Sequence, residues 1–148
     1  MKRVLIADDE PIERMIVSRT VEKYFSEELT VVSAENGREA VEQFFAGDCQ
    51  IALLDIEMPG MNGLEAAEQI RKRDKNCSII FLTAFDEFNY AKRAIAVRAM
   101  EYLLKPVEDQ ELVAVLEEAV RIAEEHETDR EAGENPSMVS ALTASSFT

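Results

Sequence analysis

The sequence lacks an apolar run long enough to cross a membrane or to act as a signal peptide. The run at residues 4–7 ends at Asp8, which is too short for the apolar region of a signal peptide. No other run approaches the ~20 residues that a membrane-spanning helix needs. From these absences we expect a soluble protein that works in the cytoplasm.

Cysteine and histidine are also scarce. Cys49 and Cys77 lie far apart in the sequence, and the single histidine, His126, lies among glutamates near the other end. No metal-ligand spacing connects these residues. We therefore expect two buried, reduced thiols rather than a disulfide or a metal site built from cysteine and histidine.

Basic residues are outnumbered nearly two to one. The chain has 16 Lys and Arg against 30 Asp and Glu, so its formal net charge is 16 − 30 = −14. Such a charge repels phosphate backbones, and we expect no direct contact between this domain and nucleic acid. With 148 residues, of which 47% are hydrophobic, the chain suits one domain with a core of its own.

Short β-branched runs alternate with longer amphipathic stretches along the chain. This alternation predicts repeated βα units and an α/β fold with a parallel sheet. The first, third and fourth strands are nearly all apolar, as interior strands are, whereas the second is shorter and predicted to be peripheral. The predicted strands are 3–7, 30–33, 51–54, 78–82 and 101–104, and the predicted helices are 11–25, 37–45, 63–73, 87–97 and 109–127.

The apolar periodicity ends after the last predicted helix. From Thr128 onward Gly133, Pro136 and several serines and threonines appear, which is typical of a linker or loose tail. We therefore predict one domain at residues 1–127 and a flexible tail or linker remnant at 128–148.

Five polar residues fall where predicted strands end. They are Asp8 and Asp9 after the first strand, Asp55 after the third, Thr83 after the fourth and Lys105 after the fifth. In an open parallel sheet, ligands bind in the crevice beyond the carboxyl ends of the strands. We therefore expect these five side chains to converge on one site.

The chemistry of these residues is coherent. Three carboxylates in one small site repel one another unless a hard cation lies among them, and Mg²⁺ prefers such oxygen ligands. A carboxylate at the rim of the site can attack phosphorus and form an acyl phosphate. Lys105 would then supply positive charge, and Thr83 a hydroxyl donor, to the phosphoryl oxygens.

Four segments carry a resemblance to a known family: VLIADDEP at 4–11, LLDIEMPGMNG at 53–63, LTA at 82–84 and YLLKP at 102–106. Over residues 2 to about 125, the chain resembles the CheY-like response-regulator receiver domains of two-component signalling. That resemblance implies a doubly wound, flavodoxin-like, five-stranded parallel sheet in the order 2-1-3-4-5, with helices on both faces.

The resemblance also implies roles for the acidic residues. Asp55 is expected to be the phosphorylation site. Asp8, Asp9 and Asp55, with the backbone carbonyl of Glu57, are expected to hold Mg²⁺. Gly63 belongs to the turn after the phosphoacceptor, where we expect glycine to serve the backbone because it tolerates positive φ.

Further roles follow from the other matching segments. Thr83, Ala84 and Lys105 match phosphate-contacting positions, and Thr83 with Tyr102 matches the switch pair of the family. The peptide bond between Lys105 and Pro106 is expected to be cis.

The resemblance also predicts partners. We expect a sensor histidine kinase as phosphoryl donor and a switched surface that binds a partner or forms a homodimer. The segments TAFDEFNYAKRAI and EYLLKPV resemble receivers that precede AraC-type DNA-binding domains, which predicts transcription control through a C-terminal effector absent from this chain. The stretch RAMEYLLKP lacks the glycine that many relatives carry before the fifth strand, and we interpret this as a loop variation.

Other readings of the sequence stay open. Haloacid-dehalogenase-like phosphatases also use an aspartate nucleophile, Mg²⁺, a threonine or serine and a lysine, although their nucleophile ends the first strand. A plain binding module of the same architecture, or a stand-alone CheY-type signalling protein, would fit the same pattern. Our expectation is a switch that gains and loses a phosphoryl group rather than a turnover enzyme.

Overall fold

Five parallel strands form one sheet in the computed structural model of the chain, which describes residues 1–134, with side chains as far as Asp129. The strand order is β2-β1-β3-β4-β5, so the expected doubly wound, flavodoxin-like topology is confirmed. The strands are β1 (Lys2–Ala7), β2 (Leu29–Ala34), β3 (Ile51–Leu54), β4 (Ser78–Thr83) and β5 (Glu101–Leu104).

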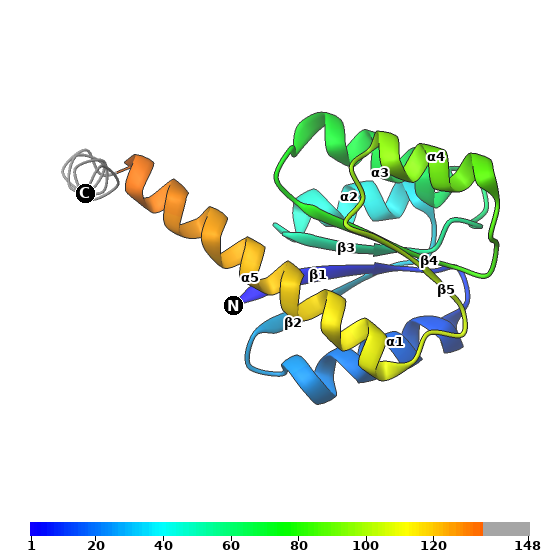
Figure 1. Ribbon diagram of the computed structural model, residues 1–148, viewed down its shortest axis with the longest axis horizontal. Coiled ribbons are helices and arrows are strands. Elements are labelled where there is room, and N and C mark those ends of the chain that lie inside the picture. Colours follow the sequence, from blue (N-terminus) through cyan, green and yellow to red (C-terminus); the bar gives the residue numbers. More distant parts are fainter. Residues whose placement is uncertain (135–148) are drawn as a thin grey trace.

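Five helices cover the two faces of the sheet (Figure 1). Helices α1 (Pro11–Phe25) and α5 (Asp109–Glu134) pack on one face. Helices α2 (Gly37–Ala46), α3 (Gly63–Arg73) and α4 (Phe88–Ala96) pack on the other. Helices α1 to α4 therefore connect consecutive parallel strands, and α5 follows the last strand, as the alternating sequence pattern predicts.

Two apolar cores result, one on each face. Alternation along β1 sends Leu5 into the core under α2 and α3, and Val4 and Ile6 into the core under α1 and α5. Strands β3 and β4 are buried along their whole length, which explains why their sequences are nearly continuous apolar runs. Strand β2 lies at the edge, as predicted, although with six residues it is as long as β1.

Local capping fixes where several helices begin. Pro11 is the first residue of α1, a position at which its missing N–H removes no helical hydrogen bond. The side chain of Asn36 accepts a hydrogen bond from the backbone N–H of Glu39 at 2.8 Å. Asn62 and Glu65 form a reciprocal capping box at the start of α3.

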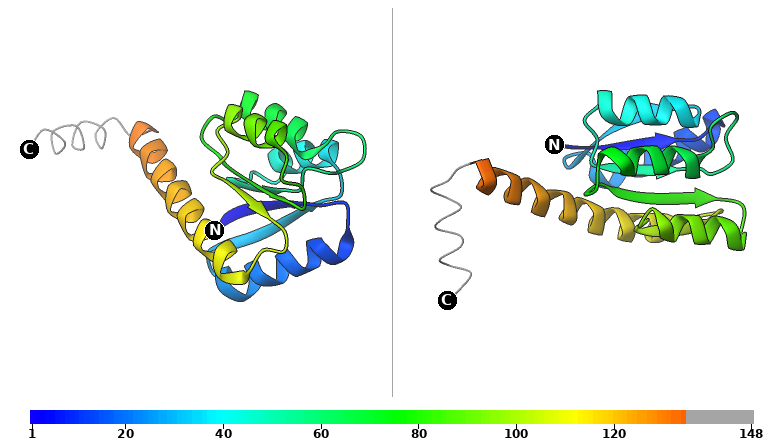
Figure 2. Two further views of the ribbon diagram at one scale, coloured as in Figure 1. Left: turned by 45° about the vertical axis from the view of Figure 1, so that its right-hand side comes forward. Right: turned by 90° about the horizontal axis from the view of Figure 1, so that it is seen from above.

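Helix α5 is longer than its apolar pattern predicts. It ends at Glu134 rather than at residue 127, and its later turns project beyond the sheet (Figure 2). Glutamate, alanine and arginine are strong helix formers, so the helix continues after its buried stripe stops at Ala123. The predicted tail at 128–148 thus starts within α5, and residues 135–148 lie outside the described residues.

The structure bears on the expected state of the cysteines and on the lack of long apolar runs. Cys49 and Cys77 are both buried and free, as expected, and burial raises the pKa of each thiol to about 12. Within residues 1–134, no helix is both long and apolar enough to span a membrane.

The position of the missing glycine has a structural consequence. Arg98 has φ of 57°, a left-handed conformation that costs a residue with a Cβ atom free energy. The N–H of Ala99 donates to the carbonyl of Ala94 at 3.0 Å and that of Arg98 to Ile95 at 2.9 Å. This pattern is the Schellman ending of a helix, in which glycine is preferred where Arg98 lies.

We predict that Arg98→Gly stabilises the protein by about 1 kcal/mol, because glycine adopts the left-handed conformation without that cost. Urea unfolding should give a higher midpoint with an unchanged slope. Asp48→Gly is the matched control, since Asp48 also has positive φ, at 50°, but aspartate tolerates it better. A gain at Asp48 equal to that at Arg98, or a loss at Arg98, would contradict the explanation.

Candidate functional site

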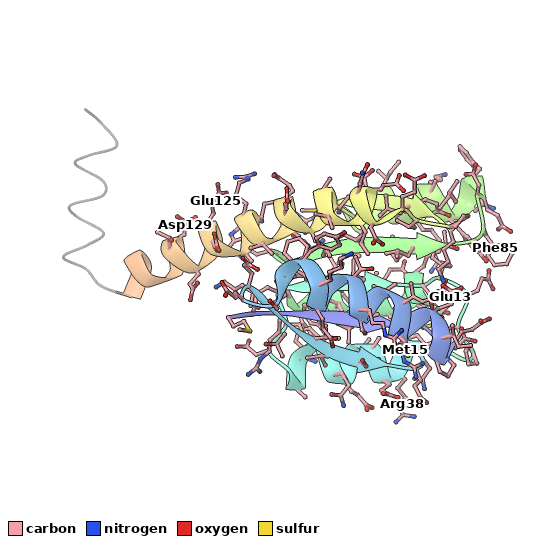
Figure 3. All side chains as sticks on the ribbon, turned by 90° about the horizontal axis from the view of Figure 1, so that it is seen from below. Glu13, Met15, Arg38, Phe85, Glu125 and Asp129 are labelled. Carbon is pink, nitrogen blue, oxygen red and sulfur yellow. The ribbon has the colours of Figure 1, made fainter. Side chains whose placement is uncertain are left out.

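The five polar residues singled out at strand ends do come together at one edge of the sheet. Asp8 and Asp9 follow β1, Asp55 follows β3, Thr83 is the last residue of β4 and Lys105 follows β5. Figure 3 labels two residues near this site, Glu13 and Phe85. They lie at the opposite end of the molecule from Glu125 and Asp129 of α5. The site thus lies far from the projecting end of α5.

The acidic residues form a tight cluster. Carboxylate oxygens of Asp8, Asp9 and Asp55 all lie within 4.8 Å of one another. Asp8 is 5% exposed and Asp55 is 9% exposed, whereas Asp9 is open to solvent. Because two of the three carboxylates are buried, their mutual repulsion is only weakly screened by water.

Lys105 partly compensates this negative charge. Its Nζ lies 2.8 Å from Oδ2 of Asp8, 3.8 Å from Oδ2 of Asp55 and 3.9 Å from a carboxylate oxygen of Glu13. Burial disfavours the charged ammonium, but the hydrogen bond to Asp8 and the charge of Asp55 outweigh this effect. The pKa of Lys105 therefore lies above its ordinary value.

The carboxyl group of Asp55 has a strongly perturbed pKa. Burial raises the pKa of Asp55 to about 6; the positive charge of Lys105 opposes this rise, and the charges of Asp8 and Asp9 add to it. The ionised side chain is thus held in an unfavourable environment that a cation would relieve.

Two further side chains reach this cluster without having been predicted from the sequence. Glu13 faces Lys105 from the first turn of α1, and Arg14 donates to the backbone carbonyl of Asp8 at 2.7 Å. Both residues lie in the first turn of α1, which starts at Pro11, one residue after the N-cap Glu10 that follows the acidic pair. Pro11, which marks the start of the helix, is the sequence signal that could have indicated Glu13 and Arg14.

Thr83 and Tyr102 are connected through a third residue. The hydroxyl of Thr83, which is fully buried, accepts a hydrogen bond from the backbone N–H of Phe85 at 3.2 Å. The hydroxyl of Tyr102 donates to the backbone carbonyl of the same residue at 2.6 Å. Ala84, between Thr83 and Phe85, is exposed at the edge of the site.

The loop after β3 is closed by a glycine, for a different reason from the one expected. Gly63 does not have a positive φ; in this loop Gly60 does, at 72°. A Cβ atom on Gly63 would lie 2.0 Å from the carbonyl oxygen of Asp55, so only glycine lets α3 start this close to β3. The N–H of Gly63 donates to the carbonyl of Ile56 at 2.9 Å.

The remaining predicted site residues also have defined positions. The Lys105–Pro106 peptide bond is cis, as the resemblance implies. Glu57 is exposed beside the cluster, and its carboxylate accepts a hydrogen bond from the hydroxyl of Tyr90 on α4.

Comparison with known proteins identifies this arrangement. The family model of the response regulator receiver domain matches residues 4–117. The chain belongs to this family. Receiver domains are signalling switches rather than turnover enzymes, they generally bind Mg²⁺, and accepting a phosphoryl group is general among them.

Individual relatives agree with this assignment. The chain is 41% identical over 118 residues to the positive alginate biosynthesis regulatory protein of Pseudomonas aeruginosa, covering 80% of this chain and 47% of that protein. It is 36% identical over 115 residues to the chemotaxis protein CheY of Thermotoga maritima, covering 78% of this chain and 94% of that protein. This receiver domain therefore spans less than half of the first relative and nearly all of the second.

A solved structure is similar both in fold and in sequence. The response regulator TrrA of Thermotoga maritima, in complex with Mg²⁺ and BeF, matches with a TM-score of 0.69 and 39% sequence identity. The match covers 80% of this chain and 99% of that chain.

We predict that Asp55→Asn stabilises the metal-free receiver domain at neutral pH. The pKa of Asp55 is about 6 when folded and about 3.9 in an unfolded chain. Ionisation of Asp55 therefore lowers the free energy of unfolding. This destabilisation is absent below about pH 4 and complete above about pH 6. The asparagine variant should gain about 1 to 2 kcal/mol above that range, after allowance for solvent screening at the rim.

Urea unfolding of both proteins between pH 4 and 8 measures this difference. The gain of Asp55→Asn should grow as the pH rises and then stay level, and added Mg²⁺ should reduce it by stabilising the wild type. Asp48→Asn, which removes an exposed carboxylate outside the cluster, should show no such dependence. A difference independent of pH would contradict the prediction.

Proposed function

We propose that this receiver domain accepts a phosphoryl group on Asp55 from a sensor histidine kinase. The observation that carries the proposal is the cluster of Asp8, Asp9 and Asp55, with the ammonium group of Lys105 between Asp8 and Asp55. A buried nucleophile of this kind needs compensating positive charge both before and after transfer. Lys105 supplies one such charge, and a cation held by the three carboxylates would supply more.

The donor set fits a magnesium ion. Carboxylate oxygens of Asp8, Asp9 and Asp55 gathered within 4.8 Å are the hard ligands that Mg²⁺ prefers, and the backbone carbonyl of Glu57 is our proposed fourth protein ligand. Bound there, Mg²⁺ would neutralise the crowded carboxylates and the charge that develops on the transferred phosphoryl group.

In the proposed step, an oxygen of Asp55 attacks the phosphorus of a phosphohistidine. The new O–P bond forms while the P–N bond breaks, and its electron pair returns to the imidazole nitrogen of the donor. Lys105 lies 3.8 Å from Oδ2 of Asp55 and can turn from Asp8 toward the phosphoryl oxygens. Thr83 and the exposed backbone at Ala84 would provide further contacts to these oxygens.

The hydrogen bonds around Phe85 support a switch. We expect the hydroxyl of Thr83 to move away from the N–H of Phe85 when it donates to a phosphoryl oxygen, and the carbonyl of Phe85 accepts the hydrogen bond from Tyr102. A displacement of the Thr83 hydroxyl would thus affect Tyr102 through the backbone of Phe85. The phosphoryl group can shift this equilibrium only by interacting better with one arrangement than with the other.

The output of the switch is also a proposal. The chain spans 47% of the Pseudomonas regulator and 33% of the transcriptional regulatory protein YesN of Bacillus subtilis. These shares support a receiver that controls a C-terminal DNA-binding effector, with α4, β5 and α5 as the partner-binding or dimerisation surface. The 94% coverage of the Thermotoga CheY supports the second candidate, a stand-alone signalling protein.

Incubation with acetyl phosphate and Mg²⁺ tests the chemistry. We expect the wild type to gain a single phosphoryl group by intact mass and Asp55→Asn to gain none, with Asp48→Asn unaffected as the matched control. Full phosphorylation of Asp55→Asn would contradict the assignment. Continuous release of phosphate would instead indicate a phosphatase, and no reaction at all would indicate an inert binding module.

Thr83→Ala tests the switch separately from the chemistry. This variant should still be phosphorylated on Asp55 but should lose most of the change at α4, β5 and α5, because alanine has no hydroxyl to move. Amide NMR shifts with and without beryllofluoride, a phosphoryl mimic, measure that change. Equal shifts across residues 87–127 in variant and wild type would show that Thr83 does not carry the response.

A further inference from the structure

Helix α4 is held on the sheet with little apolar burial. Of its nine residues only Ala94 is buried, and Phe88 and Ile95 are 81% and 77% exposed. Helix α3 beside it buries Leu64 and Ile70 completely, together with two alanines. Because apolar burial supplies most of the free energy that docks a helix, polar contacts matter more for α4 than for α3.

Among the described residues, three side-chain contacts reach α4 or its C-cap, Val97. Arg93 forms an ion pair with Glu68 of α3 at 2.6 Å, and the guanidinium of Arg71 donates to the carbonyl of Val97 at 2.8 Å. In the third contact, the hydroxyl of Tyr90 donates to the carboxylate of Glu57. Two of these contacts tie α4 to α3, whereas the third ties it to the loop that follows Asp55.

We propose that the hydrogen bond between Tyr90 and Glu57 is a latch that couples the position of α4 to the loop carrying the phosphoacceptor. Tyr90 is then a positioning residue that acts through Glu57. Half-buried against the core under α3 and α4, the ring of Tyr90 moves with its helix. The carboxylate of Glu57 moves with a backbone only two residues beyond Asp55.

The coupling part of this proposal rests on the proposed function, because Glu57 is there a backbone ligand of Mg²⁺. Ion and phosphoryl binding at Asp55 would fix the backbone of Glu57, and the latch would pass that change to the first turn of α4. This route is separate from the one through Thr83 and Phe85, which leads to Tyr102 on β5.

The latch itself is tested without any phosphoryl group. Tyr90→Phe keeps the ring and removes only the hydroxyl, and Glu57→Ala removes the acceptor. Each should lower amide hydrogen-exchange protection across residues 88–96 by up to about fivefold, the effect of losing one solvent-exposed hydrogen bond. The double variant should lose no more than either single variant. Independent, multiplicative losses would overturn the latch.

Rescue by a conservative variant sharpens this test. Glu57→Gln keeps a side-chain oxygen that can accept from the hydroxyl of Tyr90. Its protection at residues 88–96 should stay close to that of the wild type. Protection as low as in Glu57→Ala would show that the carboxylate charge, and not the hydrogen bond, holds α4.

Beryllofluoride with Mg²⁺ tests the coupling. In Tyr90→Phe, amide shift changes at residues 88–96 should fall to about half or less of the wild-type changes, while those at residues 101–104 persist. Arg93→Gln is the matched control, because it also loosens α4 but leaves Tyr90 and Glu57 in contact, so its response should persist. Undiminished changes in Tyr90→Phe, or equal losses in Arg93→Gln, would overturn the coupling. A wild type that does not respond at all would refute the proposed function and leave the hydrogen-exchange result to decide the latch.

Discussion

Three carboxylates are forced together at the carboxyl ends of β1 and β3, and the backbone of the sheet is what holds them there. The N–H of Asp55 donates to the carbonyl of Ala7 at 2.9 Å, and that of Asp8 donates to Ala34 at 3.2 Å. These bonds extend the strand pairing by one residue and fix the start of each acidic segment. Lys105 supplies only one positive charge against the three carboxylates. The site therefore favours binding of a cation, which would also offset the negative charge of a phosphoryl group.

The convergence of these residues was predictable because it depends only on strand direction. In a parallel sheet all carboxyl ends lie at one edge, so residues that follow Ala7, Leu54 and Leu104 must meet whatever the details of side-chain packing. Contacts that depend on where a helix begins, and so on which side chains it turns toward the site, were not predictable in the same way. Glu13 reaches Lys105 only because α1 starts at Pro11, after a short loop that follows the end of β1.

Other features were missed because their causes are not local in the sequence. The glycine at position 63 is required by the distance between two elements, which no local pattern specifies. The end of α5 was placed too early because an apolar stripe marks where a helix packs, whereas helix propensity decides where it stops. Arg98 occupies a glycine-like conformation because the helix ending is fixed by backbone hydrogen bonds, not by side-chain preference.

The helices around the sheet differ in how readily they can respond to events at the carboxyl ends of the strands. Helix α1 is anchored by Val21 and Phe25, and α5 by several buried residues, whereas α4 buries only Ala94. Local stability follows buried apolar area, so a given free energy displaces α4 further than it displaces α1 or α5. The polar contacts of Thr83 and Glu57 both lead toward this weakly held helix or its preceding loop. Under the proposed switch, a charge change at Asp55 would therefore be expressed at α4, even though the acidic cluster lies at the ends of the interior strands β1 and β3.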